Sequence, residues 1–383
     1  MALKITSGGS SIKINKVTFD GEINSFACFE NDDDEPIFYF KLPFEIEELP
    51  NDDFSEKIYL FKNELFENER LIKLKLKEKP EDNKLVGYMF SLRDLVNQPN
   101  VFKNIHLKKI AFNTINKLLS ETDLSLKSKK VDYRSDSDYN IFDFYDESLI
   151  VVCVCDQFVN FQNYNFKDYL PSFSKYGFKF SHNNEFYSTE TSCKVTRQNY
   201  INIDTALTLK IPNNSLHTNY FIRSLLQNDL ITSNNEIGRF HIYYQVIEML
   251  MEKVYKNEVQ EKIIAKFNTL SSFDAKELFR ETMRDSYSLE KLFGGAYSTL
   301  DSDIVDELKT NIDVFLKYVA VDYNGKETYG SIYKVRNTLF HGYSKILENS
   351  SLDKEKINSY LKLVNDSFEY LINDVILTYS KPI

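Results

Sequence analysis

Hydrophobic and polar residues alternate with two different periods along the chain, and the change falls near residue 212. Before it, short runs alternate with a period of two, which is typical of strands that bury one face. The run at residues 148–155 is more continuously apolar, which favours a strand covered on both faces. The pattern predicts strands over residues 11–14, 38–42, 71–77 and 148–155. One helix, over residues 107–120, interrupts them.

From Ser215 onward, hydrophobic residues recur with the period of a helix. Ser233 and Glu236 form a capping box that would begin the first long helix. The pattern predicts helices over residues 237–254, 260–267, 275–284, 301–319 and 357–379. Long helices joined by short connections indicate an antiparallel bundle.

These two regions predict an α+β protein of two domains, in keeping with a length of 383 residues. The first is a β-rich domain of residues 1–212, with a sub-boundary predicted in the loop at residues 132–140. The second is an all-α antiparallel helical bundle of residues 215–383. The pattern assigns no function to the β-rich domain.

The net charge of −10 argues against a protein that coats DNA or RNA, because broad phosphate contact usually needs a basic face. It leaves room for an enzyme that binds RNA locally. Lysines concentrate between Lys108 and Arg134, where they form either a solvated surface or a patch that faces phosphate. Both interpretations stay open.

The four cysteines, Cys28, Cys153, Cys155 and Cys193, lack the spacing of a zinc site, and we expect them to be reduced. The N-terminus shows no secretory signal, and no run of about 18 apolar residues predicts a membrane span. We therefore expect a cytoplasmic protein with neither a metal ion nor another cofactor.

One short segment between the last two long helices carries residues suited to catalysis. Arg336 is followed directly by Asn337, four residues separate Arg336 from His341, and Tyr343 lies two positions further on. This pattern resembles that of the HEPN superfamily of ribonucleases, in the Arg-x4-His-x-Tyr form found in toxins. Its position before the final long helix also fits the family, and the resemblance covers residues 215–383.

The helical period gives Arg336 an apolar setting. The residues predicted to form the buried face of its helix are Ile332, Val335, Leu339 and Phe340. A buried arginine without a partner is costly, so Arg336 should meet an acid or a second subunit. Glu248, on the facing helix, is the expected partner.

His341 should lie at the C-terminal end of the motif helix, since Gly342 is a natural helix terminator. The helix dipole there favours a positively charged imidazole, which suits general acid–base chemistry. Asn337, four residues earlier, shares the same face. The other histidines have no companion at ligand spacing and are expected to be structural: His106, His182, His217 and His241.

The resemblance implies a metal-independent endoribonuclease in which the ribose 2′-hydroxyl of the RNA substrate attacks the adjacent phosphorus. His341 would move protons, Arg336 would stabilise charge on the phosphoryl oxygens, and Asn337 would orient His341 or the phosphate. The family generally pairs two such domains, so a homodimer is implied. In toxins of this form the tyrosine can be modified by a partner nucleotidyltransferase, and plain packing is the alternative role for Tyr343.

Toxins and antiviral defence effectors are common in the superfamily, so the resemblance implies host defence by RNA cleavage. The β-rich domain would then be a sensor or a restraint, with a regulatory protein as a further partner. Two alternatives fit the same residues. The helical domain could bind nucleotide or RNA without cleaving it, or the chain could be a protein-interaction scaffold whose bundle only dimerises. Arg336 would then be an ion-pair residue and His341 a helix cap.

Overall fold

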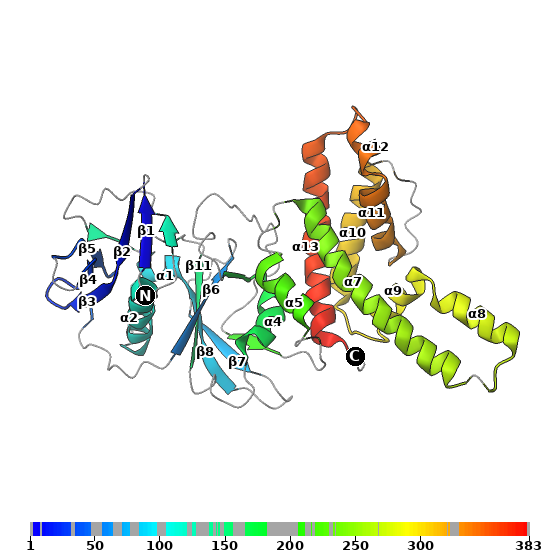
Figure 1. The fold of residues 1–383 in the computed structure, drawn as a ribbon, viewed down its shortest axis with the longest axis horizontal. Coiled ribbons are helices and arrows are strands. Elements are labelled where there is room, and N and C mark those ends of the chain that lie inside the picture. The colour runs from blue at the N-terminus through cyan, green and yellow to red at the C-terminus, as the bar shows by residue number, and fades with distance from the viewer. Residues whose placement is uncertain are drawn as a thin grey trace. The chain divides into compact units, whose positions relative to one another are not determined.

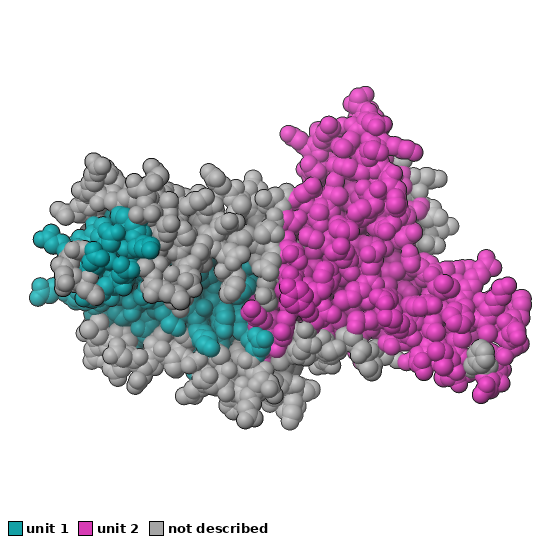
Figure 2. Space-filling view, viewed as in Figure 1, with its two compact units in different colours: residues 1–166, 177–209 teal, residues 167–176, 210–383 magenta. Residues whose placement is uncertain are grey.

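The computed structural model describes parts of both halves of the chain. The described residues are 3–7, 10–31, 35–46, 56–63, 71–76, 84–97, 105–120, 125–127, 138–140, 143, 145, 149–155, 165–181, 206–210, 216, 219–229, 233, 235–266, 268–319, 321 and 329–380. A β-rich first half is followed by helices, which confirms the predicted α+β class (Figure 1). Contacts group the chain into two units (Figure 2): Met1–Phe166 with Gly177–Leu209, and Lys167–Tyr176 with Lys210–Ile383. Residues 132–137 of the predicted sub-boundary lie outside the described residues.

Within the described residues, the first unit contains three sheets. Their strands are β1 (Leu3–Ser7), β2 (Ser10–Ile14), β3 (Lys16–Asp20), β4 (Ser25–Phe29), β5 (Phe38–Lys41), β6 (Glu56–Lys62), β7 (Ile72–Leu76), β8 (Lys84–Ser91), β9 (Ser125–Lys127), β10 (Asp138–Tyr139), β11 (Leu149–Cys155), β12 (Lys179–Ser181) and β13 (Ala206–Leu209). The sheet orders are β2-β1-β9, β10-β5-β4-β3 and β12-β6-β11-β8-β7-β13. The four strands predicted from the pattern correspond to β2, β5, β7 and β11.

Strand β11 lies inside the six-stranded sheet, where it pairs antiparallel with β6 and β8. Its first six residues are all buried, as its continuous apolar run predicted. Gly87 of β8 lies so close to β11 that a Cβ atom there would stand 2.0 Å from the carbonyl oxygen of Cys153. Only glycine, which has no Cβ atom, fits at this position. Strand β7, by contrast, alternates between buried and more exposed residues, as its period of two predicted.

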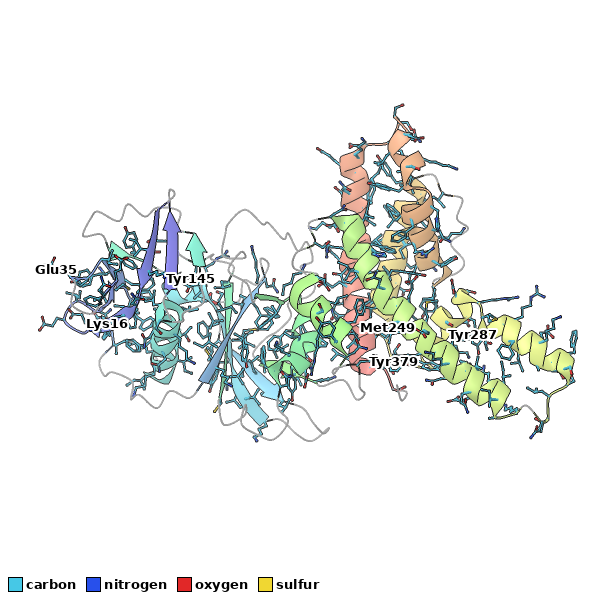
Figure 3. All side chains as sticks on the ribbon, in the orientation of Figure 1. Lys16, Glu35, Tyr145, Met249, Tyr287 and Tyr379 are labelled. Carbon is cyan, nitrogen blue, oxygen red and sulfur yellow. The ribbon has the colours of Figure 1, made fainter. Side chains whose placement is uncertain are left out.

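Helix α2 (Ile105–Ser120) packs against the core of the first unit and confirms the predicted helix of residues 107–120. The Phe112 ring meets the rings of Phe19 and Phe26 at centroid distances of 4.9 and 5.0 Å. Tyr145, labelled in Figure 3, donates a hydrogen bond to the carbonyl oxygen of Leu118 at 2.8 Å. The short helix α1 (Leu92–Asn97), directly after β8, is not predicted by the pattern.

The second unit is built from helices. They are α4 (Leu170–Lys175), α5 (Tyr220–Ser224), α7 (Glu236–Glu258), α8 (Ser272–Thr282), α9 (Asp285–Phe293), α10 (Ser302–Tyr318), α11 (Gly330–His341), α12 (Tyr343–Glu348) and α13 (Lys354–Thr378). The helix predicted over residues 260–267 is instead a π-helical turn, Val259–Ile264, that continues α7. No helix in the described part of the chain is both long enough and apolar enough to cross a membrane.

Helix α7 begins at Glu236, and its N-cap is Asn235. The Asn235 side chain accepts a hydrogen bond from the backbone N–H of Ile237 at 2.9 Å. The predicted capping box of Ser233 and Glu236 is therefore wrong. Asn235 is extended, with φ −119° and ψ 124°, so Glu236 is the first helical residue rather than the third.

A buried polar network joins α7 to α13. The guanidinium of Arg239 lies 3.0 Å from Glu236, 3.3 Å from Asp366 and 3.1 Å from Glu369. The Tyr243 hydroxyl donates to the same Glu369 carboxylate at 2.5 Å. Burial alone would lower the pKa of Arg239, but the negative groups around it raise that pKa well above its usual value. The network holds the charged Arg239 inside the bundle, and the pattern of apolar positions in the sequence does not predict this.

Residues Lys167–Tyr176 belong to the helical unit although they precede β12 and β13 in the chain. Helix α4 packs on α13, where Lys175 Nζ lies 2.7 Å from Asp374 Oδ1. The Asn373 amide nitrogen lies 3.0 Å from the Ser174 hydroxyl. The sequence pattern predicts this segment as part of the β-rich domain, because a helix of six residues is too short to show a period.

Candidate functional site

Helix α11 carries the Arg336–His341 motif on its last two turns. Ile332, Val335 and Leu339 are buried in the bundle, as predicted, whereas Phe340 is 39% exposed. The assignment of Phe340 to the buried face is therefore wrong, because the end of α11 opens to solvent together with His341. The helix ends at His341 with Gly342 at its C-cap, where the Gly342 N–H donates to the Thr338 carbonyl at 3.1 Å.

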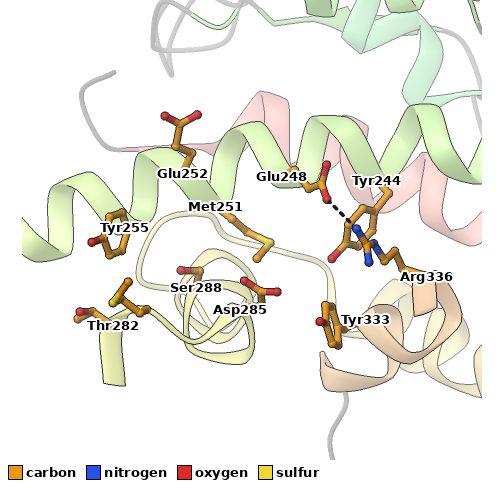
Figure 4. Close-up of a pocket in the computed structure, with 11 residues that line it drawn as sticks. Tyr244, Glu248, Met251, Glu252, Tyr255, Thr282, Asp285, Ser288, Tyr333 and Arg336 are labelled. Carbon is orange, nitrogen blue, oxygen red and sulfur yellow. Dashed lines mark ion pairs between the residues drawn. The ribbon is translucent and has the colours of Figure 1, made fainter. Parts of the chain in front are cut away.

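The guanidinium of Arg336 connects three polar groups. Its Nη1 atom lies 3.1 Å from Asn337 Oδ1 and 3.2 Å from His341 Nε2. Its Nη2 atom lies 3.8 Å from Glu248 Oε1 on α7, so the expected ion pair is present (Figure 4). The pair is less buried than the pattern predicts, since 29% of the Arg336 side chain and 50% of the Glu248 side chain are exposed.

Two aromatic rings hold the guanidinium in place. Its Cζ atom lies 5.9 Å from the centroid of Tyr244 on α7 and 5.5 Å from the centroid of Phe340 on its own helix. A planar cation over such rings gains a cation–π attraction. Arg336 is thus fixed by polar contacts at its nitrogens and by ring contacts at its plane.

The contact between Arg336 and His341 places an imidazole nitrogen beside the guanidinium. An arginine N–H group can only donate, so His341 Nε2 is the acceptor in this hydrogen bond. The charged imidazole expected from the helix dipole stays a prediction. His341 is exposed to solvent.

Asn337 and Tyr343 differ in their relation to this cluster. Asn337 bonds to Arg336, and no hydrogen bond joins it to His341 in the part of the chain that the structure describes. Tyr343 is the first residue of α12 and is partly buried. Its hydroxyl has no hydrogen bond among the described residues.

His241 also belongs to this cluster, although the sequence predicts a structural role for it. It is exposed on α7, its ring lies 4.9 Å from that of Phe340, and its Nε2 lies 3.0 Å from Gln245 Nε2. Positions 241, 245 and 248 share one face of α7 by helical spacing. That spacing relative to Glu248 is the signal that could have identified His241.

A cavity of about 380 Å³ opens beside Arg336, between α7, α9 and α11 (Figure 4). Its lining residues are Tyr244, Glu248, Met251, Glu252, Tyr255, Thr282, Met283, Asp285, Ser288, Tyr333 and Arg336. Burial, and then the charges of Asp285 and Glu248, raise the pKa of Tyr244 well above its usual value. The Tyr244 hydroxyl therefore stays protonated and can donate into the cavity.

The cluster therefore joins an acceptor nitrogen, a fixed cation and a neighbouring cavity. A base near a cation can take a proton from a hydroxyl while the cation stabilises the charge that develops on a phosphate. Among the described residues, no group of three or more histidines, cysteines, aspartates or glutamates is placed to hold a metal ion.

The other candidate features do not meet at this cluster. Part of the basic stretch, including Arg134, lies outside the described residues, as do Cys193, His182 and His217. Cys28 and Cys153 are buried in the first unit, and burial raises the pKa of the Cys28 thiol to about 12. No protein-family model, curated protein or solved structure matches the chain, so the resemblance to HEPN ribonucleases rests on the motif and its helical setting.

Proposed function

We propose that the protein is a metal-independent endoribonuclease of the HEPN type, which acts in the cytoplasm as a toxin or an antiviral defence effector. One observation carries the proposal: the Arg336 guanidinium touches both His341 Nε2 and Asn337 Oδ1 at a solvent-accessible helix end. Acid–base cleavage of RNA needs such a base and such a cation within reach of one phosphate.

In the proposed reaction, a phosphate draws Arg336 away from His341, which frees Nε2. That nitrogen takes the proton of the ribose 2′-hydroxyl, the O2′–P bond forms, and Arg336 donates to the non-bridging oxygens. The P–O5′ bond then breaks, and the protonated imidazole returns its proton to O5′. The products are a 2′,3′-cyclic phosphate and a 5′-hydroxyl, and Asn337 keeps the guanidinium oriented throughout.

The exposed end of α11 also supports a homodimer, since two copies could bring their motifs to one cleft. Light scattering of the full chain at tens of micromolar should then give the mass of a dimer. A strictly monomeric chain that still cleaves RNA would remove the dimer from the proposal. The β-rich unit would act as sensor or restraint, and Tyr343 would be the position for regulation by modification.

The test is cleavage of single-stranded RNA by the purified protein with EDTA present. We expect RNA to be cut, DNA of the same sequence to survive for lack of a 2′-hydroxyl, and the product ends to be those named above. His341→Ala should slow cleavage by about 10²–10⁴-fold, the usual contribution of a general acid–base group. Lys345→Ala, exposed on α12, is the matched control and should cleave normally.

A two- to three-fold effect of His341→Ala would place the chemistry elsewhere. A second candidate function is then a module that binds a nucleotide without cleaving it, which the cavity beside Arg336 favours. A scaffold for a protein partner is favoured by apolar side chains at and near α8, where Phe273 is 73% and Met283 66% exposed. Nucleotide binding without RNA cleavage would favour the nucleotide-binding module over the scaffold.

A further inference from the structure

The cavity beside Arg336 combines aromatic surface with hydrogen-bond acceptors. Tyr244, Tyr255 and Tyr333 contribute rings, and the buried Met251 contributes an apolar wall. Bases of single-stranded RNA stack on aromatic side chains in this way. At about 380 Å³ the space lies within the roughly 300–1,000 Å³ of pockets that bind small ligands.

The charges around the cavity determine which part of a nucleotide fits. Glu248, Glu252 and Asp285 place three carboxylates on its lining, against one cation, Arg336. A phosphate would be repelled from the carboxylates and attracted to the Arg336 end. With the phosphate held at Arg336, the neutral base of the same nucleotide is the part that can enter the cavity.

Asp285 is the carboxylate most available to a ligand. Glu248 already pairs with Arg336, and Glu252 pairs with Lys256 at 2.6 Å. Asp285, the first residue of α9, forms no ion pair among the described residues, and its side chain is exposed. Asp285 and Tyr244 both line the cavity (Figure 4).

We propose that this cavity is a guanine subsite next to the phosphate that is cleaved, an inference that rests on the proposed ribonuclease function. Guanine carries two adjacent donors, N1–H and N2–H, and a single carboxylate can accept both. Adenine and cytosine present an amino group beside an acceptor nitrogen, and uracil presents one N–H between two carbonyls. Those acceptors would face the Asp285 carboxylate without a proton to share, so guanine is preferred.

The test compares short RNAs that are identical except for one base at the cleavage junction. For the full chain, we expect the single-turnover rate to be at least about tenfold higher with guanine than with adenine, cytosine or uracil. Hypoxanthine keeps N1–H but lacks the N2 amino group, so its rate should be intermediate. Asp285→Asn should remove the guanine preference, because the guanine rate falls to within about twofold of the uracil rate measured with the same variant. Glu290→Gln, exposed on the same helix and outside the cavity, should keep the preference.

A second measurement separates this inference from the function on which it rests. Guanosine 3′-monophosphate should bind the full chain at least about tenfold more tightly than the other three nucleotides, and Asp285→Asn should abolish the difference. If RNA is cut equally at all bases and the nucleotides bind equally, the guanine subsite is refuted and the ribonuclease stands. If no RNA is cut but the selective binding is found, the ribonuclease is refuted and the subsite stands. Guanine preference that survives in Asp285→Asn also refutes this site.

Discussion

At the scale of single residues, the planar guanidinium of Arg336 has contacts that no other side chain can reproduce. Nη1 forms hydrogen bonds with Asn337 and His341, and Nη2 pairs with Glu248. The guanidinium also lies over the rings of Tyr244 and Phe340. A lysine would keep the charge but present one compact ammonium instead of a fork. In the proposed reaction, the role of Arg336 therefore depends on its shape as well as on its charge.

We expect Arg336→Lys to slow RNA cleavage by about 10²–10³-fold, the usual cost of losing a donor aimed at developing charge. Stability should change little, because a partly exposed ion pair contributes at most about 1 kcal/mol. Single-turnover cleavage and thermal unfolding followed by circular dichroism measure the two effects. Glu248→Gln serves as the comparison and should slow cleavage by less than about tenfold, since it leaves the guanidinium in place. Normal cleavage by Arg336→Lys would contradict the role proposed for the planar guanidinium.

The site could be predicted from the sequence only in part. The ion pair between Arg336 and Glu248 follows from helical faces alone, and the same reasoning applied to α7 would have found His241. The exposure of Phe340 could not be predicted, because it depends on which distant segments cover the end of α11. The cavity could not be predicted either, since α9 and α11 meet there from separate parts of the chain.

At the scale of elements, the buried network of Arg239 links α7 to α13. Asp366 and Glu369 are buried, and Arg239 is the cation that faces both. Removing one partner of a buried ion pair costs more than the pair contributes, because the remaining charge keeps its desolvation penalty. The network thus ties the helix that carries Glu248 to the long C-terminal helix.

We expect Arg239→Met to lower the free energy of unfolding by roughly 3–5 kcal/mol, because the guanidinium that faces the two buried carboxylates is lost. Urea unfolding followed by helical circular dichroism measures this. Lys256→Met is the matched control, since the Lys256–Glu252 pair has both side chains mostly exposed, and it should have little effect. Equal effects of the two substitutions would mean that the network does not stabilise the bundle.

Long elements could be predicted from the sequence better than short ones. Strands β7 and β11 and helix α13 follow directly from their periods, because each spans enough residues to show one. Helices α1 and α4 have six residues each, so the period is not visible. The π-helical end of α7 was also beyond the pattern, since apolar spacing alone does not separate a π-helical turn from an α-helix.

At the scale of the whole molecule, the helical unit is assembled from two separate stretches of the chain. Residues 167–176 carry α4, whose Leu170, Pro171 and Phe173 are buried. They pack on α13, where Asn373 and Asp374 are also buried. A fragment that begins at residue 215 would therefore leave polar and apolar groups of α13 without their cover.

We expect residues 167–383 to be expressed as a stable helical protein and residues 177–383 to be less stable. The two fragments share residues 177–383 and differ only by residues 167–176, so the comparison isolates the packing of this segment, which carries α4, on the rest of the helical unit. The shorter fragment should melt at a lower temperature and bind a hydrophobic dye, because the uncovered α13 surface becomes accessible. Equal melting temperatures would show that α4 is dispensable to the bundle.

Residues 167–383 are also the fragment with which to ask whether the β-rich unit restrains the nuclease, because the toxicity of an unstable fragment could not be interpreted. If the restraint exists, this fragment should be more toxic to cells than the full chain, and the same fragment with His341→Ala should not be.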